Sequence, residues 1–403
     1  MRLAKLALLK LAVTATLLTA CSSAQTRPPI TEGISVTLAD VVEQEMIPFR
    51  GYAFPPEMLT WLRANRVVML GEVHGVVEHE ELVLALLKEL QNTGLRHLLL
   101  EGPQAESWLT DQYVLGKIAV LPPLAEKYMR SLLAPLREFN NTLLDDQKVH
   151  VHQIDINHAD WAFPSALAMM RTAGLSHPSV STFLNAIGTA SSTGKNFSAW
   201  RKENSKTYLD LLAKLNEKLS VAEPGKSRDT SLTMVEVAQE SLKIRNIWDT
   251  EGENAAHPRR EKTIISLVEN LLELEPGPVL INMGGFHAQL EHVMGTPKVW
   301  VAEHLQKVSA QAKGSVASVY VALARQQAGE RVLFDVSDTP EPGELFALIN
   351  TLTTDSNVYL PLEHKRFGMA PIPVNYLGQV VHHSPQNQFG AYILLRSGQM
   401  RER

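Results

Sequence analysis

Four short apolar runs, each followed directly by ionisable or glycine-rich loop residues, constrain the fold of this chain more than any other feature. They span residues 67–70, 98–100, 149–154 and 279–281. Each run has the length of a strand, and in three of the four every residue is apolar. Strands that are buried on both faces have this composition, and they occur in parallel sheets covered by helices. We therefore predict an α/β fold with a mostly parallel central sheet flanked by helices.

Helical patterns and further strands complete this prediction. Leu82, Leu86 and Leu90 share one apolar face after the first run, and Asn92-Thr93-Gly94 ends that helix. Two more apolar runs, at residues 316–322 and 392–395, are predicted to be strands. No internal repeat or low-complexity segment interrupts the pattern.

Ionisable side chains follow the carboxyl ends of the four predicted strands. They are Glu72 and His74, Glu101, Asp155, and His287. Ligands of open α/β sheets bind outside the carboxyl ends of the strands. We therefore expect these five side chains, far apart in sequence, to lie together in one functional site.

The segment Glu72-Val73-His74 carries the clearest chemistry. Side chains two residues apart in an extended segment point the same way, and Glu101 would come from a neighbouring strand. An imidazole held by a carboxylate is typical of a general base. Two histidines with carboxylates are equally typical of a divalent-metal site. A hydrogen-bonded pair with a purely structural role at the strand end is the remaining interpretation.

His287 and Arg260 are the other two candidates. His287 follows Gly284 and Gly285, whose missing side chains allow a sharp turn or a close approach of a ligand. Arg260 is predicted to begin a helix after Pro258, where it could donate two bonds to a carboxylate or remain solvated. Other histidines carry less signal. We expect His79 and Glu80 on a solvated helix face and His150 and His152 in the core or on the surface; His382 and His383 lie in a polar loop without an interpretable role.

A helical tract separates the two parts of the α/β pattern. We predict a first part at residues 41–160, a helical insertion at 161–259, and a second part at 260–403. Both ends of the insertion adjoin the predicted site, so it could cover the carboxyl edge of the sheet as a lid that excludes water. An independent pair of packing helices without a role at the site is the alternative.

The first forty residues have the features of an export signal and a tether. Arg2, Lys5 and Lys10 precede a short apolar run, and Leu18-Thr19-Ala20-Cys21 fits a lipobox. We predict that residues 1–20 are removed, that Cys21 is lipidated, for example with palmitate, and that residues 21–40 form a tether to the membrane. Ser22 after the lipidated cysteine favours the outer membrane in a Gram-negative cell.

Charge and cysteine content exclude several classes of function. Removal of the three basic residues of the signal takes the net charge from −5 to −8, and no basic patch remains to bind nucleic acid. Cys21 is the only cysteine, so neither a disulfide nor a cysteine nucleophile is available. Residues 188–195 look like a phosphate-binding loop, but the spacing of the glycines is wrong and no strand precedes them. A Gly-x-Ser-x-Gly elbow is also missing, which disfavours an ordinary serine hydrolase.

Four landmarks occur in a fixed order between residues 67 and 287: residues 67–75 around Glu72 and His74, Leu99-Leu100-Glu101, Arg260-Glu261, and the glycine-led His287. Together they resemble a superfamily that contains the erythromycin esterases, the ChaN-type haem-binding lipoproteins and the TIKI-type proteins. This resemblance implies a mixed α/β sheet with glutamate and histidine residues gathered at one edge.

The two best-known branches of that superfamily imply different functions. Gly75, residues 108–113, residues 136–140 and the helical tract resemble the esterases, in which a histidine is thought to activate water for lactone hydrolysis. Esterases typically place two residues between the glutamate and the histidine, whereas one residue separates Glu72 from His74. That spacing and the lipid anchor resemble ChaN, which implies haem or iron binding. The last hundred residues match neither branch.

The leading hypothesis is a lipid-anchored hydrolase that acts on an ester, lactone or related bond. His74 would be the general base, Glu72 and Glu101 its orienting or metal-binding partners, and His287 an acid or second ligand. Asp155 and Arg260 would support them. The rival is a non-catalytic lipoprotein that binds haem.

Overall fold

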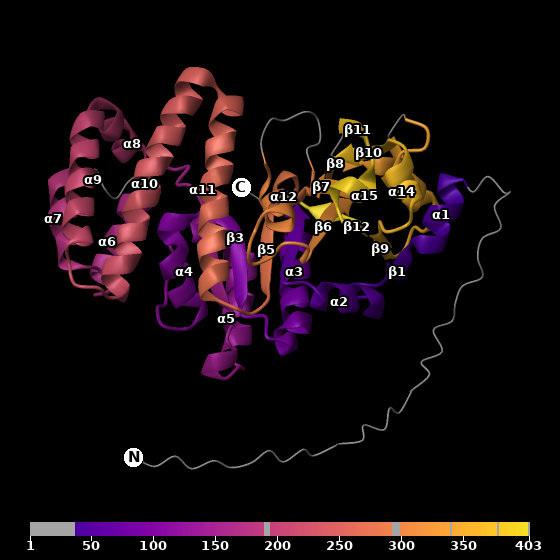
Figure 1. Ribbon diagram of the computed structural model, residues 1–403, viewed down its shortest axis with the longest axis horizontal. Helices are drawn as coiled ribbons and strands as arrows, with labels where there is room; N and C mark the ends of the chain where they lie inside the picture. The colour runs from indigo at the N-terminus through magenta and orange to yellow at the C-terminus, as the bar shows by residue number, and fades with distance from the viewer. Residues whose placement is uncertain (1–36, 189–193, 292–298, 339–340, 377–378, 402–403) are drawn as a thin grey trace, which may run out of the picture. The chain divides into compact units, whose positions relative to one another are not determined.

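An eight-stranded mixed sheet forms the centre of the protein (Figure 1). The computed structural model describes residues 37–188, 194–291, 299–338, 341–376 and 379–401, and residues 38–403 form one compact unit. The strand order is β1 (Ile47–Phe49), β9 (Asn357–Pro361), β12 (Ala391–Leu395), β6 (Val316–Leu323), β2 (Val67–Glu72), β5 (Val279–Gly284), β3 (His97–Pro103) and β4 (His150–Asp155). The six strands from β12 to β4 are parallel, and β9 is antiparallel to both of its neighbours.

The predicted α/β fold is confirmed. All four apolar runs that defined it form neighbouring strands, β2 to β5, and the runs at 316–322 and 392–395 form β6 and β12. Residues 67–71 are buried without alternation, as expected for a strand covered on both faces.

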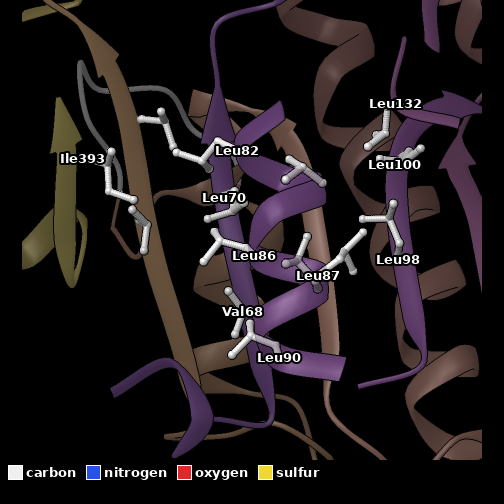
Figure 2. Packing of buried hydrophobic residues seen from close by; sticks show 14 of the residues in the cluster. Val68, Leu70, Leu82, Leu86, Leu87, Leu90, Leu98, Leu100, Leu132 and Ile393 are labelled. Atoms are coloured by element: carbon white, nitrogen blue, oxygen red, sulfur yellow. The ribbon is translucent and has the colours of Figure 1, made fainter. Parts of the chain in front are cut away.

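Helices cover both faces of the sheet. α3 (Val77–Leu90) and α5 (Pro123–Asn140) pack on the face that carries Val68, Leu70, Leu98 and Leu100 (Figure 2). α11 (Glu253–Leu274) leads back from β4 to β5, and α12 (Val301–Lys307) connects β5 with β6. Both of these connections run in the opposite direction across the sheet, so their right-handedness places α11 and α12 on the other face.

The helical tract forms a second core beside the sheet. α6 (Ala162–Thr172), α7 (Pro178–Ile187), α8 (Gly194–Glu203), α9 (Ser205–Ser220) and α10 (Lys226–Glu251) gather beyond the edge strand β4, next to α4 (Ser107–Val114) (Figure 1). Residues 188–195 are the segment that looks like a phosphate-binding loop in sequence. Gly188 follows α7 and Gly194 begins α8, while residues 189–193 lie outside the described residues.

The predicted start of the helix at Arg260 is wrong. The break between α10 and α11 falls at Gly252, whose φ of 89° is accessible to glycine at little cost. Pro258 lies inside α11 rather than in front of it. Arg260 is therefore preceded by two helical turns, and it is buried instead of solvated.

The last hundred residues add short elements around the far end of the sheet. They include α13 (Leu345–Leu352), α14 (Arg366–Met369), α15 (Pro385–Gln388), the hairpin β10 (Ile372–Tyr376) and β11 (Gln379–His383), and a small sheet of β13 (Gly398–Gln399), β7 (Arg325–Ala328) and β8 (Arg331–Asp335). At the other end of the chain, α1 (Leu38–Glu45) and α2 (Pro56–Arg63) precede β2. None of the helices in the described part of the chain has the length and apolar character needed to cross a membrane. The predicted signal, Cys21 and most of the tether lie outside the described residues.

Candidate active site

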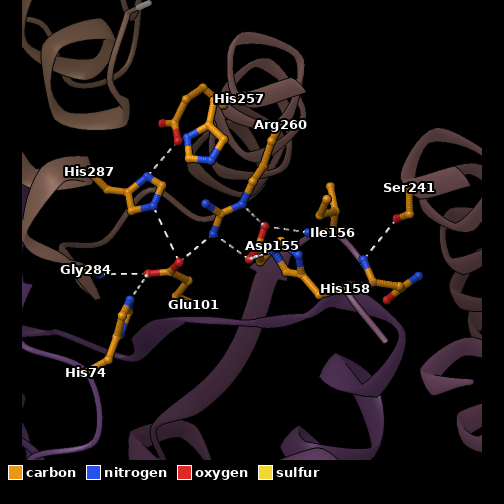
Figure 3. Close-up of polar contacts among 12 residues, drawn as sticks. His74, Glu101, Asp155, Ile156, His158, Ser241, His257, Arg260, Gly284 and His287 are labelled. Carbon is orange, nitrogen blue, oxygen red and sulfur yellow. Dashed lines mark hydrogen bonds and ion pairs between the residues drawn. The ribbon is translucent and has the colours of Figure 1, made fainter. Parts of the chain in front are cut away.

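Glu101 is the centre of a polar network at the carboxyl ends of β2, β5, β3 and β4 (Figure 3). Its Oε1 accepts a hydrogen bond from Arg260 Nη2 and lies 3.5 Å from His287 Nε2. Its Oε2 accepts a bond of 2.7 Å from the Gly284 amide and lies 3.6 Å from His74 Nε2. Burial alone would raise the pKa of Glu101, but the charges of His287, Arg260 and His74 hold it well below its usual range. Glu101 is therefore a carboxylate at neutral pH.

Arg260 connects Glu101 with Asp155 across the ends of β3 and β4. Its Nε donates to Asp155 Oδ1 at 2.9 Å, and its Nη2 donates to Asp155 Oδ2 at 2.7 Å. His158 Nε2 lies 3.0 Å from the same Oδ2. Burial opposes ionisation of Asp155, yet Arg260 and His158 lower its pKa. The forked pair that the sequence suggested for Arg260 is thus formed with a carboxylate of the site.

His287 lies directly behind Glu101, in the short 3-10 turn η5 (Gly285–Ala288) that follows β5. It is 5% exposed, and its Nδ1 lies 2.8 Å from Glu261 Oε1. Burial alone would lower the pKa of His287, but the charges of Glu261 and Glu101 raise it to about 10. At neutral pH His287 is therefore an imidazolium with a carboxylate at each ring nitrogen.

His74 is the exposed member of the network. Its side chain is 64% exposed, and its Nδ1 lies 3.1 Å from Glu72 Oε1. The other oxygen of Glu72 accepts a hydrogen bond from Asn282 on the adjacent strand. The bond to Glu72 raises the pKa of His74 despite partial burial, and the charge of Glu101 adds to this effect. A Cβ at position 284 would lie 2.8 Å from His74 Nε2, so glycine is required there for the imidazole to fit.

His79 holds the loop that carries His74 in place. The predicted position of His79, on a solvated helix face, is wrong. Instead of facing solvent, His79 is 2% exposed, and its Nδ1 accepts a 2.9 Å bond from the Val73 amide. Burial lowers the pKa of His79 to about 4, so the ring is a neutral acceptor at physiological pH. The leucine pattern of α3 did not predict this role. The pattern identifies the apolar face of the helix, and His79 lies in the first turn, before the first leucine.

The end of the described chain fixes the same loop from the other side. The Arg401 amide donates to the Gly75 carbonyl at 2.8 Å, and Met400 forms a β-bridge with Val76. The Arg401 guanidinium pairs with Glu80. Glu80 is buried, not solvated as expected, because this ion pair satisfies its charge inside the protein. No sequence pattern pointed to Arg401.

Three histidines that the sequence also offered, His150, His152 and His383, lie outside the network. His150 and His152 lie near the amino end of β4, where His152 Nε2 is 3.0 Å from His97 Nδ1 and His150 is paired with Asp111. His383 is buried and contacts the hydroxyl of Tyr376 at 2.6 Å.

Two cavities open on the network. The first has a volume of about 440 Å³, and we call it the aromatic cavity because Phe286, Trp300, Tyr320, Tyr376 and Phe389 line it. The second has a volume of about 520 Å³ and is lined by apolar residues of α5 together with charged groups, among them Leu124, Met129, Leu132, Asp155 and Arg401. Three residues line both cavities: Glu72, His74 and Glu101.

Among the described residues of the insertion predicted at 161–259, His257 alone lines one of the cavities, the aromatic cavity. The insertion's described residues between 162 and 251 line neither cavity. α10 packs against α11 and the loop after β4, where Arg245 donates to the His158 carbonyl and Ser241 accepts from the Asn157 amide. A role of the tract as a lid stays a prediction.

The donor set does not fit a divalent metal. No group of three or more His, Cys, Asp or Glu side chains in the described part of the chain is arranged to hold a metal ion. Arg260 already forms ion pairs with both Glu101 and Asp155. An imidazolium such as His287 has no free lone pair with which to bind a cation.

Comparison with protein-family models and with curated proteins finds no match. Among solved structures, a protein from Bacillus cereus is similar, with a TM-score of 0.67 at 14% identity over 91% of this chain and 98% of that one. A mutant of the erythromycin esterase EreC in its open conformation has a TM-score of 0.65 at 14% identity, over 89% of this chain and 98% of that one. The resemblance to erythromycin esterases is thus confirmed at the level of the fold. The haem-binding ChaN of Campylobacter jejuni matches with a TM-score of only 0.29 at 14% identity, over 66% of this chain and 85% of that one, which supports no inference about haem.

Proposed function

We propose that this protein is a hydrolase that cleaves an ester, lactone or related bond with water activated by His74. The observation that carries the proposal is the setting of His74: an exposed imidazole, bonded to Glu72 at Nδ1, at the boundary of two cavities. A carboxylate at Nδ1 holds the Nδ1 proton and leaves Nε2 free to accept another. Of the described histidines in the network, His74 alone lines both cavities.

The reaction follows from these positions. Nε2 of neutral His74 removes a proton from water, and the hydroxide attacks the carbonyl carbon of the substrate. The carbonyl oxygen becomes an oxyanion in the tetrahedral intermediate. When this intermediate collapses, the bond to the leaving oxygen breaks, and the proton on Nε2 passes to that oxygen. His74 returns to its neutral form, and the products are an acid and an alcohol.

Fixed charges would stabilise the intermediate. His287 and Arg260 are buried cations beside the aromatic cavity, and they are held in place by Glu101, Glu261 and Asp155 before any substrate binds. Preorganised charges of this kind need no rearrangement during the reaction. We assign His287 an electrostatic role, because it is buried and the carboxylates of Glu261 and Glu101 keep it protonated at neutral pH.

Two further considerations support the proposal. The erythromycin esterase EreC, with which this chain shares its fold, is by its name a hydrolase of this chemical kind. The lipobox at residues 18–21 supports export and attachment to a bilayer through Cys21, which would place the enzyme at the cell envelope.

Hydrolysis of a broad panel of esters, lactones and peptides by the purified mature chain tests the proposal. We expect activity without added metal, and we expect His74→Ala to lower kcat/KM by about 10²- to 10⁴-fold, the usual contribution of a general base. Glu72→Gln should also lower it. His150→Ala is the matched control, because His150 begins β4 at the opposite end of that strand from Asp155, and it should leave the rate unchanged.

The rival function, haem binding, is tested separately. A haem titration followed by visible absorbance should show no saturable shift of the Soret band. Saturable haem binding, together with no hydrolysis of any panel member with or without divalent metals, would overturn the proposal.

A further inference from the structure

The three residues shared by the two cavities are the ones proposed to activate water. The aromatic cavity and the second cavity share these three lining residues, so the cavities adjoin each other at Glu72, His74 and Glu101. Arg260 lines only the aromatic cavity, and its partner Asp155 lines only the second one. The site therefore has two adjoining compartments of similar size.

We propose that the substrate is a large, uncharged ester that occupies both compartments at once, with a ring-bearing group in the aromatic cavity and an aliphatic group in the second cavity. This inference rests on the proposed function. The bond to be cleaved must lie beside His74 Nε2, and the two compartments meet at His74. A substrate that filled only one compartment would have its reactive bond at one end and would leave the other compartment filled with water.

The lining of the compartments indicates the chemistry of each half. In the aromatic cavity, Phe286 and Trp300 stack with ring centroids 5.8 Å apart, and Tyr320 and Tyr376 meet edge to face at 5.0 Å. Such rings favour the faces and edges of another ring system. The second cavity has no such cluster among its described residues; Leu124, Met129 and Leu132 of α5 provide flexible aliphatic surface instead.

The charges of the site argue for an uncharged substrate. Four carboxylates line the cavities, and each one has a cationic or histidine partner: Glu72 with His74, Glu80 with Arg401, Glu101 and Asp155 with Arg260. A charged group on the ligand would have to displace one of these pairs, and a buried ion pair that loses one partner is strongly destabilised. The polar groups available to a neutral ligand include the amide of Gln326 in the aromatic cavity.

Binding of two naphthyl ethers tests this inference without any chemical step. 2-Methoxynaphthalene carries only the ring, whereas 2-hexyloxynaphthalene adds an aliphatic chain, and neither contains an ester or a lactone. We expect the hexyl ether to bind at least about tenfold more tightly in a fluorescence titration, because burial of several methylene groups adds to affinity. A 5-carboxypentyl ether, of similar length but charged, should lose this gain.

Variants in each compartment locate the two halves. Met129→Trp fills the second cavity, so it should reduce the affinity for the hexyl ether to that for the methyl ether and leave the methyl ether unaffected. Leu124→Phe is a second filling variant at another position, and thermal melting of each variant confirms that it folds. Trp300→Ala should weaken both ethers by the same factor. A preference for the hexyl ether that survives both filling variants, or tighter binding of the carboxylate, would overturn the inference.

Hydrolysis of two fluorogenic esters separates this inference from the proposed function. If 4-methylumbelliferyl heptanoate and acetate are not cleaved but the ethers behave as expected, the two-compartment site stands and the hydrolase proposal fails. If both esters are cleaved with equal kcat/KM in the wild type and in Met129→Trp, the hydrolase proposal stands and the two-compartment substrate is wrong.

Discussion

His74 has a carboxylate near each of its ring nitrogens, and this arrangement has opposite consequences for structure and for catalysis. The bond to Glu72 orients the ring and supports the developing imidazolium. It also stabilises the protonated form before the reaction begins, which raises the pKa of His74 above its usual value near 6.5. A base that is already protonated cannot accept a proton from water. The fraction of active enzyme therefore depends on pH in the neutral range.

The pH dependence of kcat/KM follows from this. Activity needs neutral His74 and protonated His287. It should rise with pH through the raised pKa of His74, so the acid limb should lie above pH 6.5. It should fall again as His287 loses its proton near pH 10. Removal of the Glu72 charge removes the main cause of the raised pKa, so in Glu72→Gln the acid limb should move to lower pH. A pH–rate profile measures both; an acid limb that stays in place in Glu72→Gln would contradict the assignment of His74.

Residue types at strand ends were predictable, and so were the pairing of Glu72 with His74 and of Arg260 with a carboxylate, but the buried partners of His79 and Glu80 were not. Each of Glu72, Glu101 and Asp155 ends or nearly ends an apolar run, and the sheet rule then placed them together. His79 and Glu80 were predicted to be solvated, because helical periodicity alone puts them off the leucine face. They are buried because Val73 and Arg401 supply the partners that make burial of polar groups tolerable. Those partners lie in segments outside α3, and no local sequence pattern predicts that these segments contact it.

At the scale of elements, strands buried on both faces were the easiest to predict from the sequence. β2, β3 and β5 contain continuous apolar runs, and the bounds of β2 to β5 agree with the prediction to within a few residues. Helix boundaries were harder to predict, as α11 shows. Pro258 is usually a helix breaker, but α11 continues through it, since Ala256, Arg260 and Glu261 are all buried on both sides of the proline. Tertiary contacts outweigh the local preference there.

The order of strands was the element-level property that the sequence could not provide. β5 lies between β2 and β3, although more than 170 residues separate it from β3. This insertion brings Gly284 and His287 between Glu72 and Glu101. Local patterns determine that β5 is a buried strand, but its neighbours depend on packing across the whole chain.

At the scale of the molecule, the polar network around Glu101 depends on segments from almost the full length of the described chain. The loop with His74 is supported by α3 and by Arg401, and the network itself is closed by α11 and the turn after β5. The last hundred residues matched neither branch of the superfamily in sequence. They nonetheless provide Tyr320, Tyr376 and Phe389 of the aromatic cavity. These residues become part of the site only through the fold.

The proposed attachment to a membrane also concerns the whole molecule, and Cys21 allows a direct test. Since it is the only cysteine, a thiol-linked lipid has no alternative position. In cells grown with an alkyne analogue of palmitate, the wild-type chain should become labelled and fractionate with membranes, and Cys21→Ser should not be labelled. Label on Cys21→Ser, or none on the wild type, would show that the export signal is not a lipoprotein signal.

Chemical rescue of His74→Gly is the most direct measurement of the central claim, that His74 is the base that activates water. The side chain is 64% exposed and borders two cavities, so free imidazole can reach the space that it leaves. We expect His74→Gly to fold normally, to lose hydrolysis by about 10²-fold or more, and to regain part of it in proportion to the concentration of neutral imidazole. His287→Gly, in which the lost ring is 5% exposed, should show no such recovery. Full activity of His74→Gly without imidazole, or equal rescue of both variants, would contradict the account.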